Sequence, residues 1–333
     1  MATTMKAVHY RRYGGGAAGL EHVEVSIPTP RKDEILIKLE AVSINPIDWK
    51  MQKGIFKPFV PNKFPFTPVS DVAGKVASVG RNVEGFKEGD NVVTVLPTRN
   101  GGGLAEYAIA SSNMTVKNPT EIPAAEVSGL GIAGLTALKS LELIGAKFDG
   151  TGTPSNILIT AASGGVGHYA VQLARLANFH ITATCGARNL ELVKNLGADE
   201  VLDYKTPQGE TLASPSGKKY DAVIHCGSSL PWSKFDPIIS NNGKVIDVTP
   251  TVSSIFTYSL KKLSFSKKQL LPFLLIPKFK DLQVMVNLLQ DGKIKTLVDS
   301  KFPLALAKEA WLKSMDGHAT GKVIVEMINQ NDK

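Results

Sequence analysis

Apolar and polar residues alternate in short runs along the N-terminal part of the chain, and this pattern predicts strands. Turns rich in glycine, such as residues 13–16 and 88–91, separate the runs, which cover 7–10, 34–39, 73–79, 91–96 and 106–110. Short strands at regular spacing with glycine turns are typical of a partly open β-barrel. We therefore expect residues 1 to about 122 to be all-β.

From residue 124 onwards the apolar residues recur at helical spacing, first in a helix at 129–143. Strands then alternate with helices, and the expected strands are 156–160, 180–185, 200–203, 220–226 and 243–248. This alternation indicates a doubly wound parallel sheet and an α/β fold. After helices at 281–291 and 305–314, a last strand at 322–327 is expected to return to the barrel.

A glycine turn joins the first strand of the predicted parallel sheet to its helix. The stretch from Ala162 to Gly167 reads ASGGVG. A strand, a glycine turn, a helix and a second strand within about 30 residues form the unit that binds a dinucleotide, with its pyrophosphate at the helix N-terminus. The alternative is a tight turn in an ordinary α/β domain. The predicted cofactor-binding residues are Ser163, Gly164, Gly165, Val166 and Gly167.

The end of the second strand bears on the choice of cofactor. An NAD site usually has Asp or Glu about 20 residues after the glycines, where it binds the ribose 2′-hydroxyl. No acid lies between His168 and Leu190, whereas Gly186 and Arg188 follow the strand. A planar guanidinium pairs well with a 2′-phosphate. The sequence therefore predicts NADPH, with a solvated Arg188 as the alternative.

The composition is that of a globular protein from a reducing compartment. The chain has 333 residues, 43% of them hydrophobic, which suggests two domains and a sizeable core. Its net charge of +8 suits an anionic cofactor, an acidic substrate or an anionic membrane surface. Nucleic acid is not expected, because no zinc-finger spacing, RNP motif or basic heptad region occurs. The two cysteines, Cys185 and Cys226, lie in apolar runs, so we expect no disulfide.

Six sequence motifs accompany the glycine turn in one order along nearly the whole chain. They are Asn45–Lys50 (NPIDWK), Asp71–Gly74 (DVAG), Gly89–Asp90 (GD), Gly134–Leu138 (GLTAL), Leu196–Asp199 (LGAD) and Gly317–Lys322 (GHATGK). Together they resemble the medium-chain dehydrogenase/reductase superfamily. Within it the chain is similar to the zinc-free quinone oxidoreductase branch and its plant chloroplast members, with enone and alkenal reductases as neighbours.

The resemblance implies a domain arrangement and a reaction. A GroES-like β-barrel catalytic domain would comprise residues 1–124 and 269–333, and a Rossmann domain that binds NADPH would comprise 125–268. The implied activity is reduction of the carbon–carbon double bond of α,β-unsaturated carbonyl compounds, with hydride added to the β-carbon. The implied location is the chloroplast, peripheral on the inner envelope membrane, and the N-terminal residues show no cleavable transit peptide.

Zinc is not expected. Zinc alcohol dehydrogenases of this superfamily carry a ligand cysteine where this chain has Asn45, and their Gly-His-Glu motif falls on Val69–Asp71. Their structural cysteines would fall near residues 96–104, which contain none. A catalytic zinc site needs three Cys, His or carboxylate ligands.

The resemblance also assigns roles to individual residues. Asn45 and Asp48 would position cofactor and substrate, and Lys50 would bond the nicotinamide ribose or a developing enolate, so these three are the predicted catalytic residues. The alternatives are an Asx-turn before Pro46 and a solvated lysine. The remaining predicted cofactor contacts are Thr136, Tyr204 and His318, together with Cys226, Gly227, Val248 and Thr249 at strand ends, where ligands lie in open α/β sheets.

The segment from Lys261 to Lys280 is unusual because it has six lysines and no acid among large apolar residues. In one interpretation this segment covers a substrate pocket or a subunit interface. A subunit interface would make the protein a homodimer. In the other it binds an anionic membrane surface, to which each lysine would contribute about 1 kcal/mol.

The sequence thus predicts an NADPH-dependent enone reductase that uses no metal. Two alternatives stay open. One is NADPH-dependent quinone reduction on the same scaffold. The other is a non-catalytic protein that holds NADPH and docks to membrane or RNA, because fold alone does not fix function.

Overall fold

The computed structural model describes the chain except residues 1–2, 58–59, 62, 150, 229 and 328–333. It divides into two compact units, one of Met1–Ala133 with Pro277–Lys333 (unit 1) and one of Gly134–Ile276 (unit 2). Among the described residues, no helix is long and apolar enough to cross a membrane.

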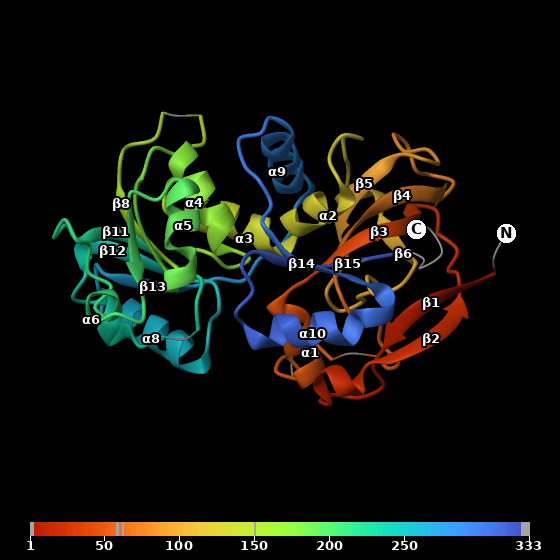
Figure 1. Ribbon diagram of the computed structural model, residues 1–333, viewed down its shortest axis with the longest axis horizontal. Helices are drawn as coiled ribbons and strands as arrows, with labels where there is room; N and C mark the ends of the chain where they lie inside the picture. The colour runs from red at the N-terminus through yellow and green to blue at the C-terminus, as the bar shows by residue number, and fades with distance from the viewer. Residues whose placement is uncertain (1–2, 58–59, 62, 150, 229, 328–333) are drawn as a thin grey trace. The chain divides into compact units, whose positions relative to one another are not determined.

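Unit 2 is built on a six-stranded sheet with the order β10-β9-β8-β11-β12-β13, in which every neighbouring pair is parallel. Figure 1 shows α4 and α5 on one face of this sheet and α6 and α8 on the other. The prediction of a doubly wound parallel sheet is therefore confirmed. The strands are β8 (Asn156–Thr160), β9 (His180–Cys185), β10 (Glu200–Asp203), β11 (Tyr220–His225), β12 (Ile239–Asp247) and β13 (Gln269–Pro272).

The helices of unit 2 differ more from the prediction. Helix α8 (Val252–Leu263) and strand β13 were not predicted, although they overlap the lysine-rich segment. The predicted helix at 129–143 is shorter, since a 3-10 turn precedes α3. The other helices are α3 (Ile132–Glu142), which begins in unit 1, α4 (Gly167–Leu176), α5 (Leu190–Asn195), α6 (Pro207–Glu210) and α7 (Trp232–Phe235).

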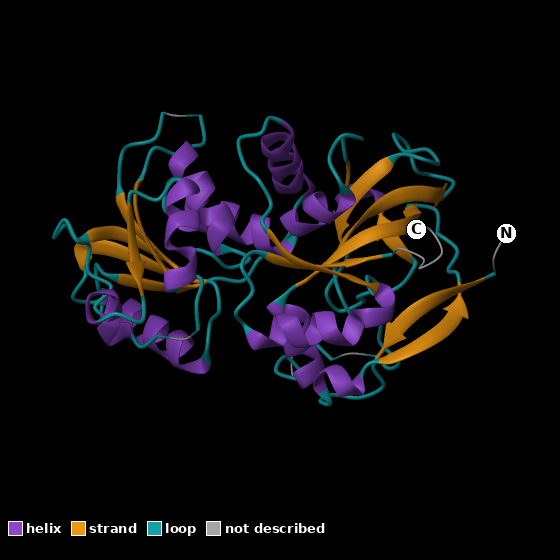
Figure 2. Cartoon of the chain, viewed as in Figure 1, coloured by secondary structure: helices purple, strands orange, loops and turns teal. Residues whose placement is uncertain are grey.

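Unit 1 contains a seven-stranded sheet and a two-stranded one (Figure 2). The larger sheet has the order β14-β15-β3-β4-β5-β7, with β6 also paired to β3, and the smaller joins β1 to β2. The strands are β1 (Thr4–His9), β2 (Glu21–Ser26), β3 (Glu34–Ile44), β4 (Asp71–Val79), β5 (Asn91–Val95), β6 (Tyr107–Ser111), β7 (Thr115–Lys117), β14 (Val298–Pro303) and β15 (Lys322–Glu326).

Strand β3 is longer than predicted because it has two successive partners on one side. Residues 34–38 pair with β6, and residues 41–44 pair with β15, which comes from the other end of the chain. The expected return of the last strand to the first part of the fold is therefore confirmed. Such long-range pairing leaves no local signal in the sequence.

Unit 1 is not all-β up to residue 122, so that prediction was wrong. Helix α1 (Pro46–Lys53) follows β3 directly and has proline at its first turn, a favoured position. Helices α2 (Ala124–Val127), α9 (Phe279–Gln290) and α10 (Ala307–Asp316) complete the unit. Trp311 of α10 is fully buried in the core between the sheet and α1, where its Nε1 donates to Gln52 at 3.1 Å.

Candidate functional site

The glycine turn of unit 2 has the close strand–helix approach that a dinucleotide site needs. A Cβ atom at Gly167 would lie 2.3 Å from the Ala161 carbonyl oxygen, so only glycine fits there. Ala161 has a φ of 49°, a left-handed conformation that turns the chain sharply after β8. Residues 163–166 are partly exposed at the N-terminus of α4, which spans ten residues. The turn can therefore present backbone N–H groups to an anion.

Residues predicted to bind the adenosine 2′-phosphate lie together at the carboxyl ends of β9 and β10. The Tyr204 ring lies 3.6 Å from where a Cβ of Gly186 would be, and Arg188 is exposed on the turn between them. Lys205, to which the sequence gave no role, has its Nζ 5.9 Å from the centre of the Tyr204 ring. A guanidinium, an ammonium and an aromatic face suit a phosphorylated adenosine.

The predicted contacts at the ends of β11 and β12 are held to each other. The Thr249 hydroxyl donates to the Gly227 carbonyl at 2.8 Å, and Val248 N donates to the His225 carbonyl at 3.2 Å. Burial raises the pKa of the Cys226 thiol to about 12, so this thiol stays protonated. Thr136 is nearly buried on α3.

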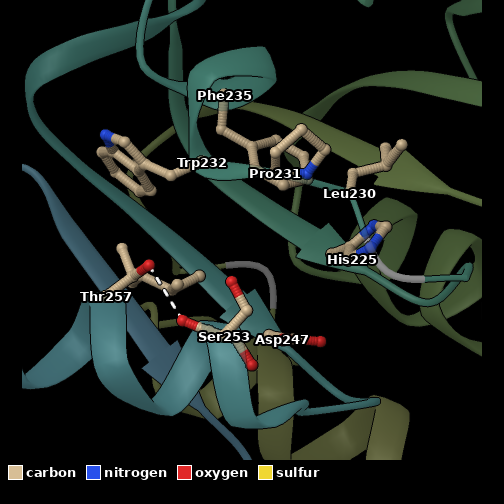
Figure 3. Close-up of a pocket in the computed structure, with 10 residues that line it drawn as sticks. His225, Leu230, Pro231, Trp232, Phe235, Asp247, Ser253 and Thr257 are labelled. Atoms are coloured by element: carbon tan, nitrogen blue, oxygen red, sulfur yellow. Dashed lines mark hydrogen bonds between the residues drawn. The ribbon is translucent and has the colours of Figure 1, made fainter.

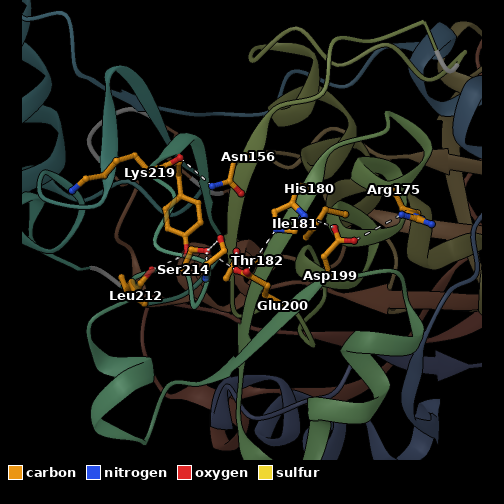
Figure 4. Close-up of polar contacts among 12 residues, drawn as sticks. Asn156, Arg175, His180, Ile181, Thr182, Asp199, Glu200, Leu212, Ser214 and Lys219 are labelled. Carbon is orange, nitrogen blue, oxygen red and sulfur yellow. Dashed lines mark hydrogen bonds and ion pairs between the residues drawn. The ribbon is translucent and has the colours of Figure 1, made fainter.

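A second polar cluster in unit 2 lies at the opposite, amino end of the sheet (Figure 4). There the Thr182 and Ser214 hydroxyls donate to Glu200 at 2.7 and 2.6 Å, and Ile181 N donates to Asp199 at 2.8 Å. These polar groups form hydrogen bonds with one another, and those bonds connect β9 to β10. We assign this cluster to the structure of the sheet, because ligands of open α/β sheets bind at the carboxyl end.

Unit 1 contains a buried cluster of two acids, an amide and an ammonium. The Asn45 amide nitrogen donates to Asp71 at 2.7 Å and to the Ser43 carbonyl at 3.1 Å, and its oxygen accepts from Lys322 Nζ at 2.5 Å. Asn45, Asp71 and Lys322 are all at most 3% exposed. The Asn45 amide therefore fixes an acid and a cation of opposite charge rather than facing solvent.

Asp71 and Asp48 are each held by a backbone N–H at a helix N-terminus. Asp71 accepts from Ile132 N at 2.9 Å, and it fills the space above Gly131, where a Cβ would lie 2.1 Å from its Oδ1. Asp48 accepts from Asn45 N at 2.7 Å and so caps α1. The sequence predicted Asp48 in the site, but it gave Asp71 and Lys322 no role.

The ionisation of this cluster is set by burial. Burial raises the pKa of Asp48 to about 8, and the neighbouring Asp71 carboxylate adds to that rise. Burial also raises the pKa of Asp71, to about 6, although Lys322 and the Asn45 amide oppose the rise. Burial lowers the pKa of Lys322, and both aspartates oppose this effect. At neutral pH Asp48 is therefore protonated, whereas Asp71 is mostly ionised and lies close enough to Lys322 to oppose the fall in the pKa of that lysine.

Lys50 and His318 lie outside this buried cluster. Lys50 is half-buried on α1, with its Nζ 5.8 Å from the centre of the Trp49 ring. His318 is exposed in the loop that precedes Lys322. Their predicted roles toward a cofactor or substrate stay predictions, as do those of the other site residues. Among the described residues, no three His, Cys, Asp or Glu side chains gather where they could hold a metal ion.

Two protein-family models match this chain. The family model described as alcohol dehydrogenase GroES-like domain matches residues 31–120, and the one described as zinc-binding dehydrogenase matches residues 196–325. The chain belongs to the medium-chain dehydrogenase/reductase family, and the predicted GroES-like and Rossmann architecture is confirmed. It is an oxidoreductase.

Individual relatives narrow this class. The chain is 62% identical to the chloroplast envelope quinone oxidoreductase homolog of Arabidopsis thaliana, over 97% of this chain and 98% of the relative. It is 31% identical to the NADPH-dependent alkenal/one oxidoreductase, chloroplastic, of the same plant, over 97% of this chain and 80% of the relative. The solved quinone oxidoreductase of Coxiella burnetii has a TM-score of 0.86 at 27% identity and covers 98% of this chain and 100% of its own. The chain thus falls among quinone oxidoreductase homologues, and a small-molecule substrate, a nicotinamide cofactor and a chloroplast location are supported.

The raised pKa of Asp48 predicts a stability that falls as pH rises. Between the ordinary pKa of about 4 and the native value of about 8, the folded state keeps a proton that the unfolded state has lost. The free energy of unfolding should therefore fall by up to about 1.4 kcal/mol per pH unit in this window from this group. Replacement of Asp48 by Asn, which resembles the protonated acid, should stabilise the protein at pH 8 and have little effect at pH 4.

Urea unfolding of wild type and Asp48→Asn at several pH values measures this difference. Glu88→Gln, on an exposed turn of unit 1, is the matched control and should leave the pH dependence unchanged. Parallel curves for wild type and Asp48→Asn would contradict the assignment of a buried neutral acid.

Proposed function

We propose that the protein is an NADPH-dependent reductase of the carbon–carbon double bond in α,β-unsaturated carbonyl compounds. The observation that supports metal-free chemistry most directly is the bond from Lys322 Nζ to Asn45. Asn45 stands where zinc-dependent members of the family have a ligand cysteine, and here its oxygen is engaged by an ammonium of the protein itself. The relative named as an alkenal/one oxidoreductase supports the choice of reaction.

The residues of unit 2 fit the proposed cofactor. The turn at 163–167 would hold the pyrophosphate, and Arg188, Lys205 and Tyr204 would hold the adenosine 2′-phosphate. When bound, NADPH supplies a hydride to the β-carbon of the activated alkene. The ends of β11 and β12 would contact the nicotinamide half, mainly through backbone groups.

The residues of unit 1 would stabilise the charge that develops on the substrate. Addition of hydride at the β-carbon places negative charge on the carbonyl oxygen, where a fixed cationic donor is most effective. We assign this role to Lys50, whose ammonium is half-buried on α1. Asn45 and Asp48 act by positioning, because they fix the start of α1 that carries Lys50. Solvent or a side chain then protonates the α-carbon.

Cofactor preference follows from the cationic groups at the ends of β9 and β10. NADPH should bind at least about tenfold more tightly than NADH, which is about 1.4 kcal/mol. Arg188→Ala should shrink this ratio, because the pairing with the 2′-phosphate is lost. Fluorescence titration with both cofactors measures it. Arg175→Ala, an exposed arginine of the same unit, is the control, and equal affinities of wild type for NADPH and NADH would remove the proposed site.

Lys50 should matter mainly in the transition state if it stabilises an enolate. Lys50→Ala should then lower kcat and kcat/KM together, by about tenfold or more, in assays of NADPH oxidation with a simple enone. If Lys50 instead holds the nicotinamide ribose, KM for NADPH should rise with little change in kcat. Lys53→Ala, three residues along α1, is the matched control. A Lys50→Ala enzyme indistinguishable from wild type would exclude both roles.

Quinone reduction is the second candidate, because relatives of 57–62% identity carry quinone oxidoreductase names. Parallel assays with an enone and with a quinone separate the two reactions. The proposed function requires a higher kcat/KM for the enone, and turnover of the quinone alone would favour the alternative.

We also propose that the protein associates peripherally with an anionic membrane surface, the inner envelope of the chloroplast. The support comes from α8, whose polar side faces the protein. Val252, Phe256 and Leu263 are 86%, 64% and 76% exposed, whereas the less exposed residues of the helix are Ser254, Thr257, Tyr258 and Lys261. A surface helix normally has the opposite arrangement. With no acid from residue 248 to 280, this apolar face and its lysines match an anionic lipid surface better than a second, equally basic copy.

Membrane association should be salt-sensitive and should depend on α8 and its flanking lysines. Within unit 2, Lys262 and Lys267 are exposed, whereas Lys261 packs on Trp232 and Lys268 on Asp236. Replacing Lys262 and Lys267 by Gln should reduce sedimentation with anionic vesicles severalfold at physiological salt, where the Debye length is about 8 Å.

The matched control replaces exposed lysines of unit 1, namely Lys32, Lys87 and Lys293, by Gln. It should bind vesicles like wild type. If the α8 variant still sediments with vesicles, or changes its oligomeric state or loses its turnover instead, this surface covers a subunit interface or a substrate pocket and not a membrane.

A further inference from the structure

Thr160 and His225 end two neighbouring parallel strands, β8 and β11, where they lie side by side in the register of the sheet. The Thr160 hydroxyl oxygen lies 2.8 Å from His225 Nδ1, and it also accepts a hydrogen bond from Cys226 N at 3.1 Å. Both side chains are at most 4% exposed. One hydroxyl therefore joins the end of β8 to two consecutive residues of β11 and its following loop.

The Thr160 hydroxyl oxygen accepts from Cys226 N, and it keeps a second lone pair and its own hydrogen for the bond with His225 Nδ1. The direction of that bond follows the tautomer of the ring. Burial lowers the pKa of His225, with Asp247 and the Ser228 backbone opposing this effect, so the ring is neutral at neutral pH. Nε2 has no hydrogen-bond partner within the described structure.

The far side of the ring faces a small hollow and not a polar partner. Leu230, Pro231 and Trp232 line one side of this hollow, and Ser253 of α8 lies on the other (Figure 3). The Phe235 ring packs edge-on against His225 with 5.1 Å between ring centres. Among the described residues, the side chain that forms a hydrogen bond with the His225 ring is thus that of Thr160.

The same strand ends are tied to β12. The bonds from Val248 N to the His225 carbonyl and from the Thr249 hydroxyl to the Gly227 carbonyl continue the network across the sheet. Three neighbouring loops, those after β8, β11 and β12, are therefore fixed relative to each other. Thr160 and His225 are the pair of side chains that joins the first loop to the second.

The strand order indicates which half of the cofactor these loops meet. In the order β10-β9-β8-β11-β12, the glycine turn follows the middle strand, β8. Arg188 and Tyr204 lie on the side of β9 and β10, where the adenosine half would bind. A dinucleotide whose pyrophosphate lies at the glycine turn must extend its other half over the ends of β11 and β12.

We propose that Thr160 and His225 are positioning residues that hold the glycine turn and the β11 loop at the separation required by the nicotinamide half of the cofactor. This inference rests on the proposed NADPH-dependent function. It requires only the Nδ1 side of His225, which contacts the Thr160 hydroxyl.

Three variants test this. Thr160→Val removes the hydroxyl at nearly constant volume, and His225→Phe keeps a ring but removes the nitrogen that bonds the hydroxyl. His225→Asn retains a hydrogen-bonding group close to the position of Nδ1. Thr160→Val and His225→Phe should each weaken NADPH binding by about tenfold, whereas His225→Asn should bind nearly like wild type. The double variant should be no weaker than the single ones, because both remove one interaction.

Binding of adenosine 2′,5′-bisphosphate, which lacks the nicotinamide half, separates positioning from general damage. Its affinity should be unchanged in all three variants, and Thr182→Val in β9 is the matched control for loss of a buried hydroxyl. Equal loss of both ligands, unchanged NADPH binding by Thr160→Val, or an Asn variant as weak as the Phe variant would each overturn the inference. Failure of the wild type to bind NADPH would overturn the proposed function and the inference with it.

Discussion

The buried hydrogen bonds by which Asn45 joins Asp71 to Lys322 are the constraint that organises the candidate site of unit 1. Lys322 is 3% exposed and Asp71 is fully buried, so neither ion can regain its hydration. Burial of a lone ion costs several kcal/mol, and removal of one partner of a buried pair typically costs about 3–5 kcal/mol. Asn45 reduces the cost of burying these two groups, because its amide nitrogen donates to Asp71 and its amide oxygen accepts from Lys322.

The positions of these groups follow from the strands that carry them. Asn45 follows the end of β3, Asp71 begins β4 and Lys322 begins β15, and both of these strands pair with β3. The same end of β3 starts α1, which carries Lys50. The buried cluster therefore determines where α1 begins and holds the predicted catalytic lysine in a defined place. Chemistry without a metal is consistent with a cation that the fold itself supplies.

In unit 2 the proposed binding site for a large anionic ligand consists mainly of backbone groups and contains few side chains. Parallel strands bring their carboxyl ends to one edge, and the chain turns there with glycine at positions where a Cβ cannot fit. The side chains that are buried at this edge, Thr160 and His225, act on the loops. The exposed side chains of Arg188 and Lys205 follow β9 and β10 and are the ones that we propose for the adenosine 2′-phosphate.

Much of unit 2 could be predicted from the sequence, because its signals are local. The strands β8, β9 and β10 have the predicted bounds, since short apolar runs between turns define buried parallel strands. Strand β12 starts earlier than predicted, at Ile239, because residues such as Asn241 and Asn242 give no strand signal. Helix α8 was missed for a related reason, since its apolar residues face outward and the large adjacent apolar run masks its period.

The candidate site in unit 1 could be predicted only in part. Asn45 and Asp48 were found because they lie in one motif, NPIDWK. Lys322 and Asp71 were given no role because their partners are far away in sequence. The burial of Lys322 near an acid depends on the fold, and no local sequence pattern distinguishes it from an exposed lysine. The contact between Thr160 and His225 likewise depends on the register of two strands, which no local pattern encodes.

The fate of the hydride is the most direct test of the proposed reaction. NADPH with deuterium at both C4 positions should be incubated with the protein and a simple enone, and the product examined by NMR. We expect the saturated ketone with deuterium at the β-carbon and a solvent-derived proton at the α-carbon. Deuterium at the carbonyl carbon of an allylic alcohol, or consumption of NADPH only when a quinone replaces the enone, would contradict the proposed reaction.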